Sequence, residues 1–226
     1  MISLSKRLYA IAEMVPSCGV LADVGTDHGY LPVWLLQQGR VGRVLASDIH
    51  RGPLQKARET AEAYGLSDSM ETILADGLQF PNADLAQVIT ICGMGGETMI
   101  SILEAAPWTV ENRQLILQPQ SKLPELEAWL KAHRFSIENA KLCMDGGKLY
   151  LMLLVLGGAP WSSGAEAILS LKRDPLFPEY VQNELRKVRY AGEGLSKSEN
   201  DHTDLMHALE LRLSELLQYE KEISQW

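Results

Sequence analysis

Two kinds of hydrophobic run alternate along residues 4–157 of the chain. Short, mostly apolar runs have the length of a buried parallel strand, whereas longer apolar segments have the length and spacing of helices. The short runs predict strands at 20–25, 42–48, 70–75, 85–92 and 114–118. The longer segments predict helices at 4–14, 29–38, 53–64, 97–105 and 123–133. Such alternation is typical of an α/β fold in which helices cover a parallel sheet.

The last two strands are predicted to run antiparallel. Residues 136–144 and 148–156 are rich in apolar side chains and are separated only by Asp145-Gly146-Gly147. An Asp-Gly turn between two such runs indicates a hairpin. The sequence therefore predicts a seven-stranded, Rossmann-like sheet that finishes with an antiparallel pair.

The pattern changes after residue 158, and no further strand is legible. Apolar side chains recur at spacings of three and four on both sides of the polar stretch 192–201: Val181, Leu185 and Val188 before it, and Met206, Leu209, Leu213 and Leu216 after it. This spacing predicts two facing helices in an antiparallel coiled-coil hairpin. Because both seams are short for a coiled coil, packing of these helices back onto the first domain is the alternative. We expect domains at 1–158 and 159–226.

Composition narrows the class of protein. The 226 residues suffice for one sizeable domain with an appendage, and a 46% share of hydrophobic residues supplies a core. No run approaches the roughly 18–20 apolar residues of a membrane span, and residues 1–7 lack the apolar core of a signal peptide. Cys18, Cys92 and Cys143 are widely spaced and lack metal-ligand partners, so we expect reduced thiols and no metal. We predict a cytoplasmic protein without membrane contacts.

The formal net charge of −8 bears on nucleic acid as a partner. Self-repulsion argues against indiscriminate binding to polyanions. It does not exclude specific binding, because the few Lys and Arg side chains that touch phosphates decide the affinity.

The predicted strands end in acidic residues or glycine, namely Asp23 with Gly25, Asp48, Asp76 and Gly93. Carboxyl ends of parallel strands share one edge, where doubly wound folds bind their ligands. Gly25 and Gly29 bracket a turn that permits close ligand approach, although Gly-x-x-x-Gly also fits a plain tight connection. Asp48 follows Gly25 by 23 positions, close to the spacing at which an acidic residue meets a ribose.

The acidic residues of this set also have simpler alternatives. Asp48 fits a cap for the following helix, and Asp76 fits a solvated turn. As ligand-binding groups, Asp48 accepts hydrogen bonds from ribose hydroxyls and Asp76 accepts one from an adenine amine. The placement of one such group after each of several strands favours a nucleotide-like ligand.

Five segments carry a resemblance to a known family. They are residues 23–30 (DVGTDHGY), 75–78 (ADGL), 91–96 (ICGMGG), 115–119 (LILQP) and 145–150 (DGGKLY). With these segments, the antiparallel end of the sheet and the helical tail, nearly the whole chain resembles the bacterial tRNA (adenine(22)-N1)-methyltransferase family, a class I S-adenosylmethionine-dependent branch. The first segment is generic, whereas its combination with Gly-Met-Gly-Gly and the tail is far more specific.

The resemblance implies a Rossmann-like catalytic domain, S-adenosylmethionine as the cofactor, and a tail that helps to hold tRNA. Its cofactor-binding residues would be Asp23, Gly25, Thr26, Asp27, His28 and Gly29 around the methionine part, Asp48 and Ile49 at the ribose, Asp76 and Gly77 at the adenine, and Gly93 and Met94 beside the methyl group.

Asp27, Tyr30 and Met94 are the candidates for a part in the reaction itself. Adenine N1 carries a lone pair and needs no prior deprotonation, so orientation is the main demand. Asp27 is a candidate for stabilising the cationic product, although binding of the cofactor's ammonium group is the favoured alternative. Tyr30 fits either a stacking partner for a flipped base or a core residue. His28 equally fits a simple turn residue.

The fourth strand ends in Cys92 and Gly93-Met94-Gly95-Gly96. Enzymes of this fold that methylate exocyclic amines have an Asn/Asp-Pro-Pro-aromatic turn here, so its absence favours a ring nitrogen. We expect Cys92 to be a buried small side chain and not a nucleophile, because carbon methylation through a covalent cysteine would need a supporting acid.

A discontinuous basic track is the candidate tRNA-binding surface. Its members are Lys6, Arg7, Arg186, Lys187, Arg189 and Lys197. The alternative is an ordinary solvated helix face, because the tail also contains many acidic residues.

Two other functions remain open from sequence alone. One is an S-adenosylmethionine-dependent methyltransferase for a small molecule or protein, which the acidic charge mildly favours. The other is a non-catalytic RNA-binding module that has kept the fold. A nicotinamide dehydrogenase is disfavoured, because the dinucleotide fingerprint is incomplete and no Tyr-x-x-x-Lys pair is present.

Overall fold

The structure is a computed structural model that describes residues 1–160, 171–195 and 203–224. The chain forms two compact units, Met1–Leu171 and Lys172–Trp226. The boundary predicted at residues 158 and 159 stays a prediction, because the chain between the last strand and the second unit lies largely outside the described residues.

The first unit is built on one seven-stranded sheet with the order β3-β2-β1-β4-β5-β7-β6. Its strands are β1 Cys18–Val24, β2 Val41–Asp48, β3 Met70–Leu74, β4 Val88–Met94, β5 Gln114–Pro119, β6 Phe135–Asp145 and β7 Lys148–Gly157. The pairs among β1 to β5 are parallel, whereas β7 runs antiparallel to both β5 and β6. The predicted Rossmann-like sheet with an antiparallel end is therefore confirmed.

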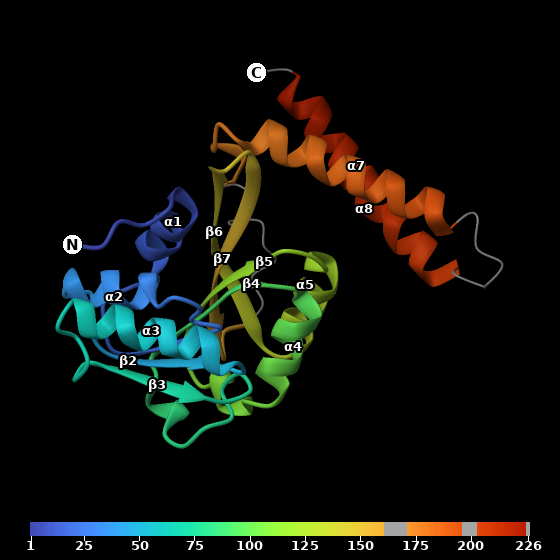
Figure 1. Cartoon of the computed structure of the whole chain (residues 1–226). Coiled ribbons are helices and arrows are strands. Elements are labelled where there is room, and N and C mark those ends of the chain that lie inside the picture. Colours follow the sequence, from blue (N-terminus) through green and yellow to red (C-terminus); the bar gives the residue numbers. More distant parts are fainter. Residues whose placement is uncertain (161–170, 196–202, 225–226) are drawn as a thin grey trace. The chain divides into compact units, whose positions relative to one another are not determined.

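Helices cover both faces of this sheet, as Figure 1 shows. Helices α1 (Lys6–Met14), α2 (Tyr30–Gln37) and α3 (Arg51–Ala63) lie on one face, and α4 (Gly96–Glu104) and α5 (Leu123–Ala132) lie on the other. One prediction was wrong at its boundary. Ala83–Leu85 form a short 3-10 helix, and β4 begins only at Val88, because Leu85 is exposed and does not enter the sheet.

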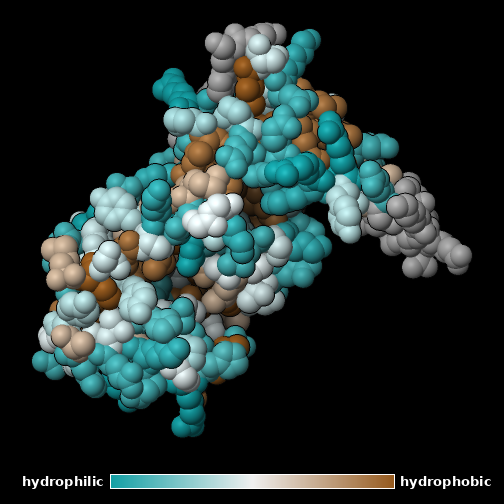
Figure 2. All heavy atoms as spheres, turned by 45° about the horizontal axis from the view of Figure 1, so that its top comes forward, coloured by the Kyte–Doolittle hydropathy of each residue, from teal (hydrophilic) through white to brown (hydrophobic). Residues whose placement is uncertain are grey.

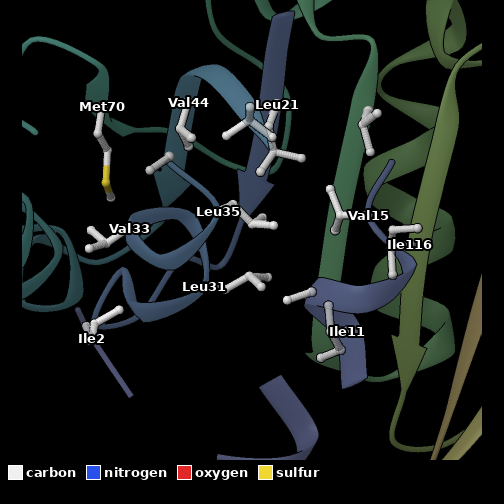
Figure 3. Close-up of a cluster of buried hydrophobic side chains, with 14 of the residues drawn as sticks. Ile2, Ile11, Val15, Leu21, Leu31, Val33, Leu35, Val44, Met70 and Ile116 are labelled. Atoms are coloured by element: carbon white, nitrogen blue, oxygen red, sulfur yellow. The ribbon is translucent and has the colours of Figure 1, made fainter. Parts of the chain in front are cut away.

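The core under the first face fixes the start of α2. Leu31 and Leu35 of this helix point toward Leu21 of β1 and Ile11 of α1 (Figure 3), and all four side chains are buried. Val33 is also buried, so α2 contributes apolar side chains on more than one side. A helix buried in this way cannot rotate or slide cheaply, since tightly packed interiors resist displacement. The loop that precedes α2 is held in place as a result.

The second unit is an antiparallel helical hairpin of α7 (Phe177–Leu195) and α8 (Thr203–Ile223). The start of α7 lies against the end of α8, where the rings of Phe177 and Tyr219 meet edge to face at 5.8 Å. Of the predicted seam residues, Val181, Leu185 and Leu216 are buried. The two predicted helices are confirmed, whereas their coiled-coil geometry stays a prediction.

Hydrophilic side chains cover most of the face drawn in Figure 2, with hydrophobic side chains in smaller patches between them. Within the described ranges, no helix is both long and apolar enough to cross a membrane. The same residues contain no group of three or more His, Cys, Asp or Glu side chains placed to hold a metal ion.

Candidate active site

The first unit contains a cavity of about 500 Å³ at the carboxyl ends of β1, β2, β3 and β4. The predicted site residues on its wall are Asp23, Gly25, Thr26, Asp27, His28, Tyr30, Asp48, Ile49, Asp76, Gly77, Gly93, Met94 and Arg7. The shared edge explains this convergence, because each strand delivers its last residues to the same place.

The turn between β1 and α2 depends on two glycines for different reasons. Gly25 has a φ of +71°, and a Cβ there would overlap the Cε atom of Met94. Gly29 also has a φ of +71° and caps α2, but a Cβ there would press on Ala57 of α3 instead of on the cavity. Gly25 therefore keeps the cavity open, whereas Gly29 allows two helices to approach and does not line the cavity.

Backbone hydrogen bonds hold this turn to the neighbouring strand. The amides of Gly25 and Thr26 both donate to the carbonyl of Ser47, at 2.8 and 3.1 Å. Asp27 follows in the left-handed region with a φ of +51°, which aspartate tolerates better than most side chains. Its carboxylate is 74% exposed and lies 3.7 Å from Nε2 of His28.

Two polar groups on the cavity wall are buried but incompletely satisfied. The Asp23 side chain is only 5% exposed and accepts a 2.5 Å hydrogen bond from Oγ1 of Thr90. Burial raises the pKa of this carboxyl above its usual value. The Thr26 hydroxyl also lies close enough to influence Asp23, yet it is buried without a well-formed hydrogen bond among the described residues. A polar ligand would complete this wall, because buried polar groups in native proteins nearly always have partners.

Asp48 ends β2 at the middle of the cavity. Its Oδ1 accepts a 2.8 Å hydrogen bond from the amide of His50, which is the cap residue of α3. Asp48 thus shapes the turn before α3, which is close to the capping alternative, and its carboxylate still lines the cavity. Ile49 beside it is exposed.

Asp76 and Gly77 follow β3 at the other end of the cavity. Gly77 has a φ of +59°, and a Cβ there would come within 2.9 Å of the Ile102 side chain of α4. The hydroxyl of Ser47 donates to the Gly77 carbonyl at 2.8 Å and ties this segment to β2. Asp76 itself is exposed at the rim.

The end of β4 contains a bulge at Gly93. The register with β5 shifts between Cys92 and Met94, and Gly93 has a φ of +80°. Bulges occur beside active sites because they change the direction of a side chain or leave backbone open to a ligand. Cys92 lies at the floor, where burial and the Asp23 charge raise the pKa of its thiol, so the group is protonated at neutral pH.

Arg7 reaches the same floor from α1. Its Nη1 donates to Oε1 of Gln118 at 3.0 Å, and its guanidinium lies over the Tyr150 ring at 5.6 Å. No carboxylate among the described residues forms an ion pair with this guanidinium. The cavity therefore presents both a buried carboxyl group, Asp23, and a guanidinium without an ion-pair partner among the described residues, Arg7.

Several predicted residues lie elsewhere or behave differently from expected. Lys6 does not line the cavity, Arg186, Lys187 and Arg189 belong to the second unit, and Lys197 lies outside the described residues. Tyr30 is 41% exposed and stacks on the His28 ring at a centroid distance of 5.2 Å. The alternative of a core tyrosine at position 30 is therefore wrong.

The sequence reasoning missed three polar residues on the cavity wall, namely His50 at the cap of α3, Thr98 in α4 and Gln120 after β5. Gln120 directly follows one of the five segments that carry the family resemblance. Its position after a predicted strand, like that of the acidic residues, was the signal that would have found it.

The fold and the cavity together define a Rossmann-like methyltransferase. A family profile described as a methyltransferase domain matches residues 4–153. The tRNA (adenine(22)-N(1))-methyltransferase of Bacillus subtilis is 34% identical over 158 residues, which cover 70% of this chain and 66% of that enzyme. The chain belongs to the tRNA (adenine(22)-N(1))-methyltransferase family.

Solved structures agree with this family over both units. Streptococcus pneumoniae Sp1610, solved in complex with S-adenosyl-L-methionine, is 32% identical with a TM-score of 0.79, covering 97% of this chain and 100% of that one. The B. subtilis m1A22 tRNA methyltransferase TrmK is 26% identical over its structure, with a TM-score of 0.80 and the same two coverages.

Proposed function

We propose that this protein transfers a methyl group from S-adenosylmethionine to N1 of adenine 22 in tRNA. The observation that carries the proposal is the cavity at the end of β1, β2 and β4, in a chain whose relative from B. subtilis is named for this reaction. A tRNA-modifying enzyme acts where tRNA is found, so we also propose a cytoplasmic location.

The cavity suits the proposed cofactor in charge and in shape. The methionine end of S-adenosylmethionine carries an ammonium and a carboxylate, and the wall offers the carboxylates of Asp23 and Asp27 together with the cation of Arg7. Gly25, whose backbone lines the cavity beside Met94, and the unsatisfied hydroxyl of Thr26 lie in the same turn. We assign the methionine part to residues 23–28 on this basis, whereas Gly29, predicted with them, packs against α3.

The other end of the cavity suits the nucleoside. Asp48 would accept hydrogen bonds from the ribose hydroxyls, with Ile49 packed beside the sugar. Asp76 and Gly77 would bind the adenine of the cofactor, which places the methyl group next to Gly93 and Met94. This order along the cavity follows the order of the strands β1, β2 and β3 outward from the centre of the sheet.

Methyl transfer to adenine N1 requires little of the protein beyond orienting the base and the cofactor. Bound S-adenosylmethionine supplies an electrophilic methyl group, which adenine N1 takes with its own lone pair while the carbon–sulfur bond breaks and its electrons stay on sulfur. The positive charge thereby moves from sulfur to the base. The side chains orient the base, exclude water and favour the cation, and Asp27 is our candidate for the last of these roles. No side chain has to remove a proton before the attack.

The substrate must reach the cavity as an unstacked base. We propose that Tyr30, exposed at the rim on the first turn of α2, stacks on that base. Lys6 on the first unit, and Arg186, Lys187, Arg189 and Lys197 on the second, are proposed to contact tRNA phosphates. Arg7, which lies at the cavity floor, is proposed to face the carboxylate of the cofactor instead. Tyr190, next to this cluster, is 80% exposed and adds a surface for stacking.

Methylation of an unmodified tRNA transcript tests the proposal. Incubation with labelled cofactor should place the label on the base at position 22, and a transcript with guanine at that position should remain unlabelled. Cofactor binding measured by calorimetry separates the alternatives. Binding without any transfer to tRNA would favour a small-molecule or protein substrate, to which the net charge of −8 points. Absence of binding would favour a non-catalytic RNA-binding module.

A further inference from the structure

The segment Gln118-Pro119-Gln120 at the end of β5 holds two glutamines in opposite situations. Gln118 is fully buried, and its Oε1 accepts the hydrogen bond from Arg7. Gln120 is exposed and lines the cavity. The Gln120 side-chain amide makes no hydrogen bond to any described residue. Gln118 is therefore a structural glutamine, whereas the amide of Gln120 is available to a ligand.

The backbone fixes Gln120 next to the proposed place of methyl transfer. The backbone N–H of Gln120 donates to the Met94 carbonyl at 2.9 Å, which continues the β4–β5 pairing beyond the Gly93 bulge. Its Nε2 lies 3.6 Å from the point where a Cβ of Gly93 would stand. Because Gly93 has no side chain, the space beside this amide is open to a flat group.

A glutamine amide matches one edge of adenine in particular. It pairs with two hydrogen bonds, accepting from the N6 amine and donating to N7. This leaves N1, on the other side of the N6 amine, free to face a methyl group. Guanine presents two acceptors on the same edge and cannot satisfy the amide oxygen, and a pyrimidine has no N7.

We propose that Gln120 recognises the target adenine by its N6 and N7 atoms and so turns N1 toward the methyl group beside Gly93 and Met94. The proposal rests on the proposed function, because it assigns the base specificity of that reaction. The Met94 carbonyl fixes the backbone from which Gln120 extends.

The test compares a change in the protein with a change in the RNA, both of which remove the hydrogen bond to N7. One is made in the protein, Gln120→Leu, and the other in the RNA, where 7-deazaadenosine replaces adenosine at position 22. Loss of the paired contact should lower kcat/KM of Gln120→Leu on normal tRNA about 10- to 100-fold. Loss of the N7 contact alone should lower kcat/KM of the unchanged enzyme about three- to tenfold. Because Gln120→Leu no longer uses N7, it should methylate both RNAs equally well.

Two more variants complete the design. Gln120→Glu has the same shape and still accepts from N6, but it turns a second acceptor toward N7. It should therefore show no 7-deaza penalty and should methylate the 7-deaza RNA at least as well as normal tRNA. Gln55→Leu, on the exposed surface of α3, should behave as the unchanged enzyme with both RNAs. Cofactor affinity by calorimetry and melting temperature should match the unchanged enzyme in all variants, which excludes a general loss of structure.

The outcomes separate the two proposals. If Gln120→Leu and Gln120→Glu keep the full 7-deaza penalty, Gln120 does not read N7 and the inference is wrong, while the proposed function stands. If the unchanged enzyme methylates neither RNA at position 22, the proposed function itself fails. A penalty present in the unchanged enzyme and Gln55→Leu but absent in both Gln120 variants supports the inference.

Discussion

Single residues at the end of β1 decide how the cavity is shaped and charged. Gly25 has no side chain, which leaves room for the Met94 side chain beside it. Asp23 carries a buried carboxyl group, which is unfavourable unless it has a hydrogen-bonding or charged partner. Asp27 differs from Asp23, because it is exposed and free to turn toward a ligand. The two aspartates therefore offer a fixed and an adjustable carboxyl group to the same cavity.

Asp27→Asn separates cofactor binding from chemistry. Asparagine also tolerates the left-handed backbone at this position, so the fold should be retained. If Asp27 binds the cofactor's ammonium group, loss of the charge should weaken cofactor affinity about 10- to 100-fold, the equivalent of a charged hydrogen bond. Turnover at saturating cofactor should then be unchanged. Calorimetry with single-turnover rates checks both, and a loss of rate with unchanged affinity would instead place Asp27 at the cationic base.

Cys92→Ser should retain methyl transfer. Desolvation and the Asp23 charge raise the pKa of this half-buried thiol, so it is not ionised at neutral pH. We expect a loss of stability in the common range of about 0.5–3 kcal/mol, because a hydroxyl replaces a half-buried sulfur. Denaturant unfolding measures that cost and single-turnover methylation measures the rate. Abolished transfer in a folded variant that still binds cofactor would show that the thiol takes part.

The acidic and glycine residues of the site were predictable from sequence, because each directly follows an apolar strand. Gln120 was missed, because a glutamine after proline is typical of a loop. Only its place at the end of a predicted strand indicates a site residue. Arg7 was predicted to contact RNA, but its contacts with Gln118 and Asp145 join parts of the chain more than 100 positions apart. No local pattern reveals such a contact.

Among the elements, α1 shows how the hairpin between β6 and β7 supports the site. Ser5 caps the helix by accepting from the Leu8 amide, and Oδ2 of Asp145, at the end of β6, accepts from the Arg7 amide at 3.0 Å. A carboxylate at a helix N-terminus is favourable because of the exposed amides and the helix dipole. The turn of the hairpin thereby holds the helix that carries Arg7.

Asp145→Asn should lower stability in a way that depends on pH. Hydrogen bonds from the Arg7 amide and from Ser5 hold the pKa of Asp145 below its usual value in the folded state. Its contribution is therefore complete above the pKa of the unfolded chain and is lost as pH falls through the lower folded value. Thermal melting from pH 7 down to about pH 3 should show the wild type and Asp145→Asn converging.

Asp68→Asn is the matched control, in an exposed turn before β3. A melting difference between wild type and Asp145→Asn that stays constant down to the lowest pH would contradict the assigned role of the carboxylate.

Element types could be predicted more securely than their ends. The strands and helices of the first unit were found because apolar runs and turn residues agree along the chain. The start of β4 was misplaced, since Leu85 continues the apolar run in sequence while its side chain faces outward. The bulge at Gly93 was equally invisible, because only the register with β5 defines it.

At the scale of the whole molecule, the open question is how each unit contributes to tRNA binding. On α7, Arg186 is hydrogen-bonded to Asn183 and Lys187 is paired with Glu184 at 2.7 Å. The Arg186 contact is exposed and therefore weak, so a phosphate can replace it at little cost. Lys187 is itself exposed, although its partner Glu184 is buried. The basic cluster is consequently compatible with an interface despite the acidic total charge.

The triple variant Arg186→Ala, Lys187→Ala, Arg189→Ala should weaken tRNA binding and its dependence on salt. Each lost phosphate contact should reduce the slope of log affinity against log salt by about 0.7–0.9. Lys56→Ala with Lys131→Ala, two exposed cations of α3 and α5, serves as the control. A titration in which the triple variant keeps the wild-type slope would remove the α7 cluster from the interface.

The order β5-β7-β6 has a consequence for synthesis on the ribosome. Because β7 lies between its two neighbours, β6 emerges first and has no place in the sheet until β7 follows it. During that interval β5 presents an unpaired edge, the kind of surface that invites wrong pairing. Residues 158–226 are translated after Gly157, which takes several seconds at about 5–20 residues per second. The sheet can close during these seconds, while the chain is still attached to the ribosome.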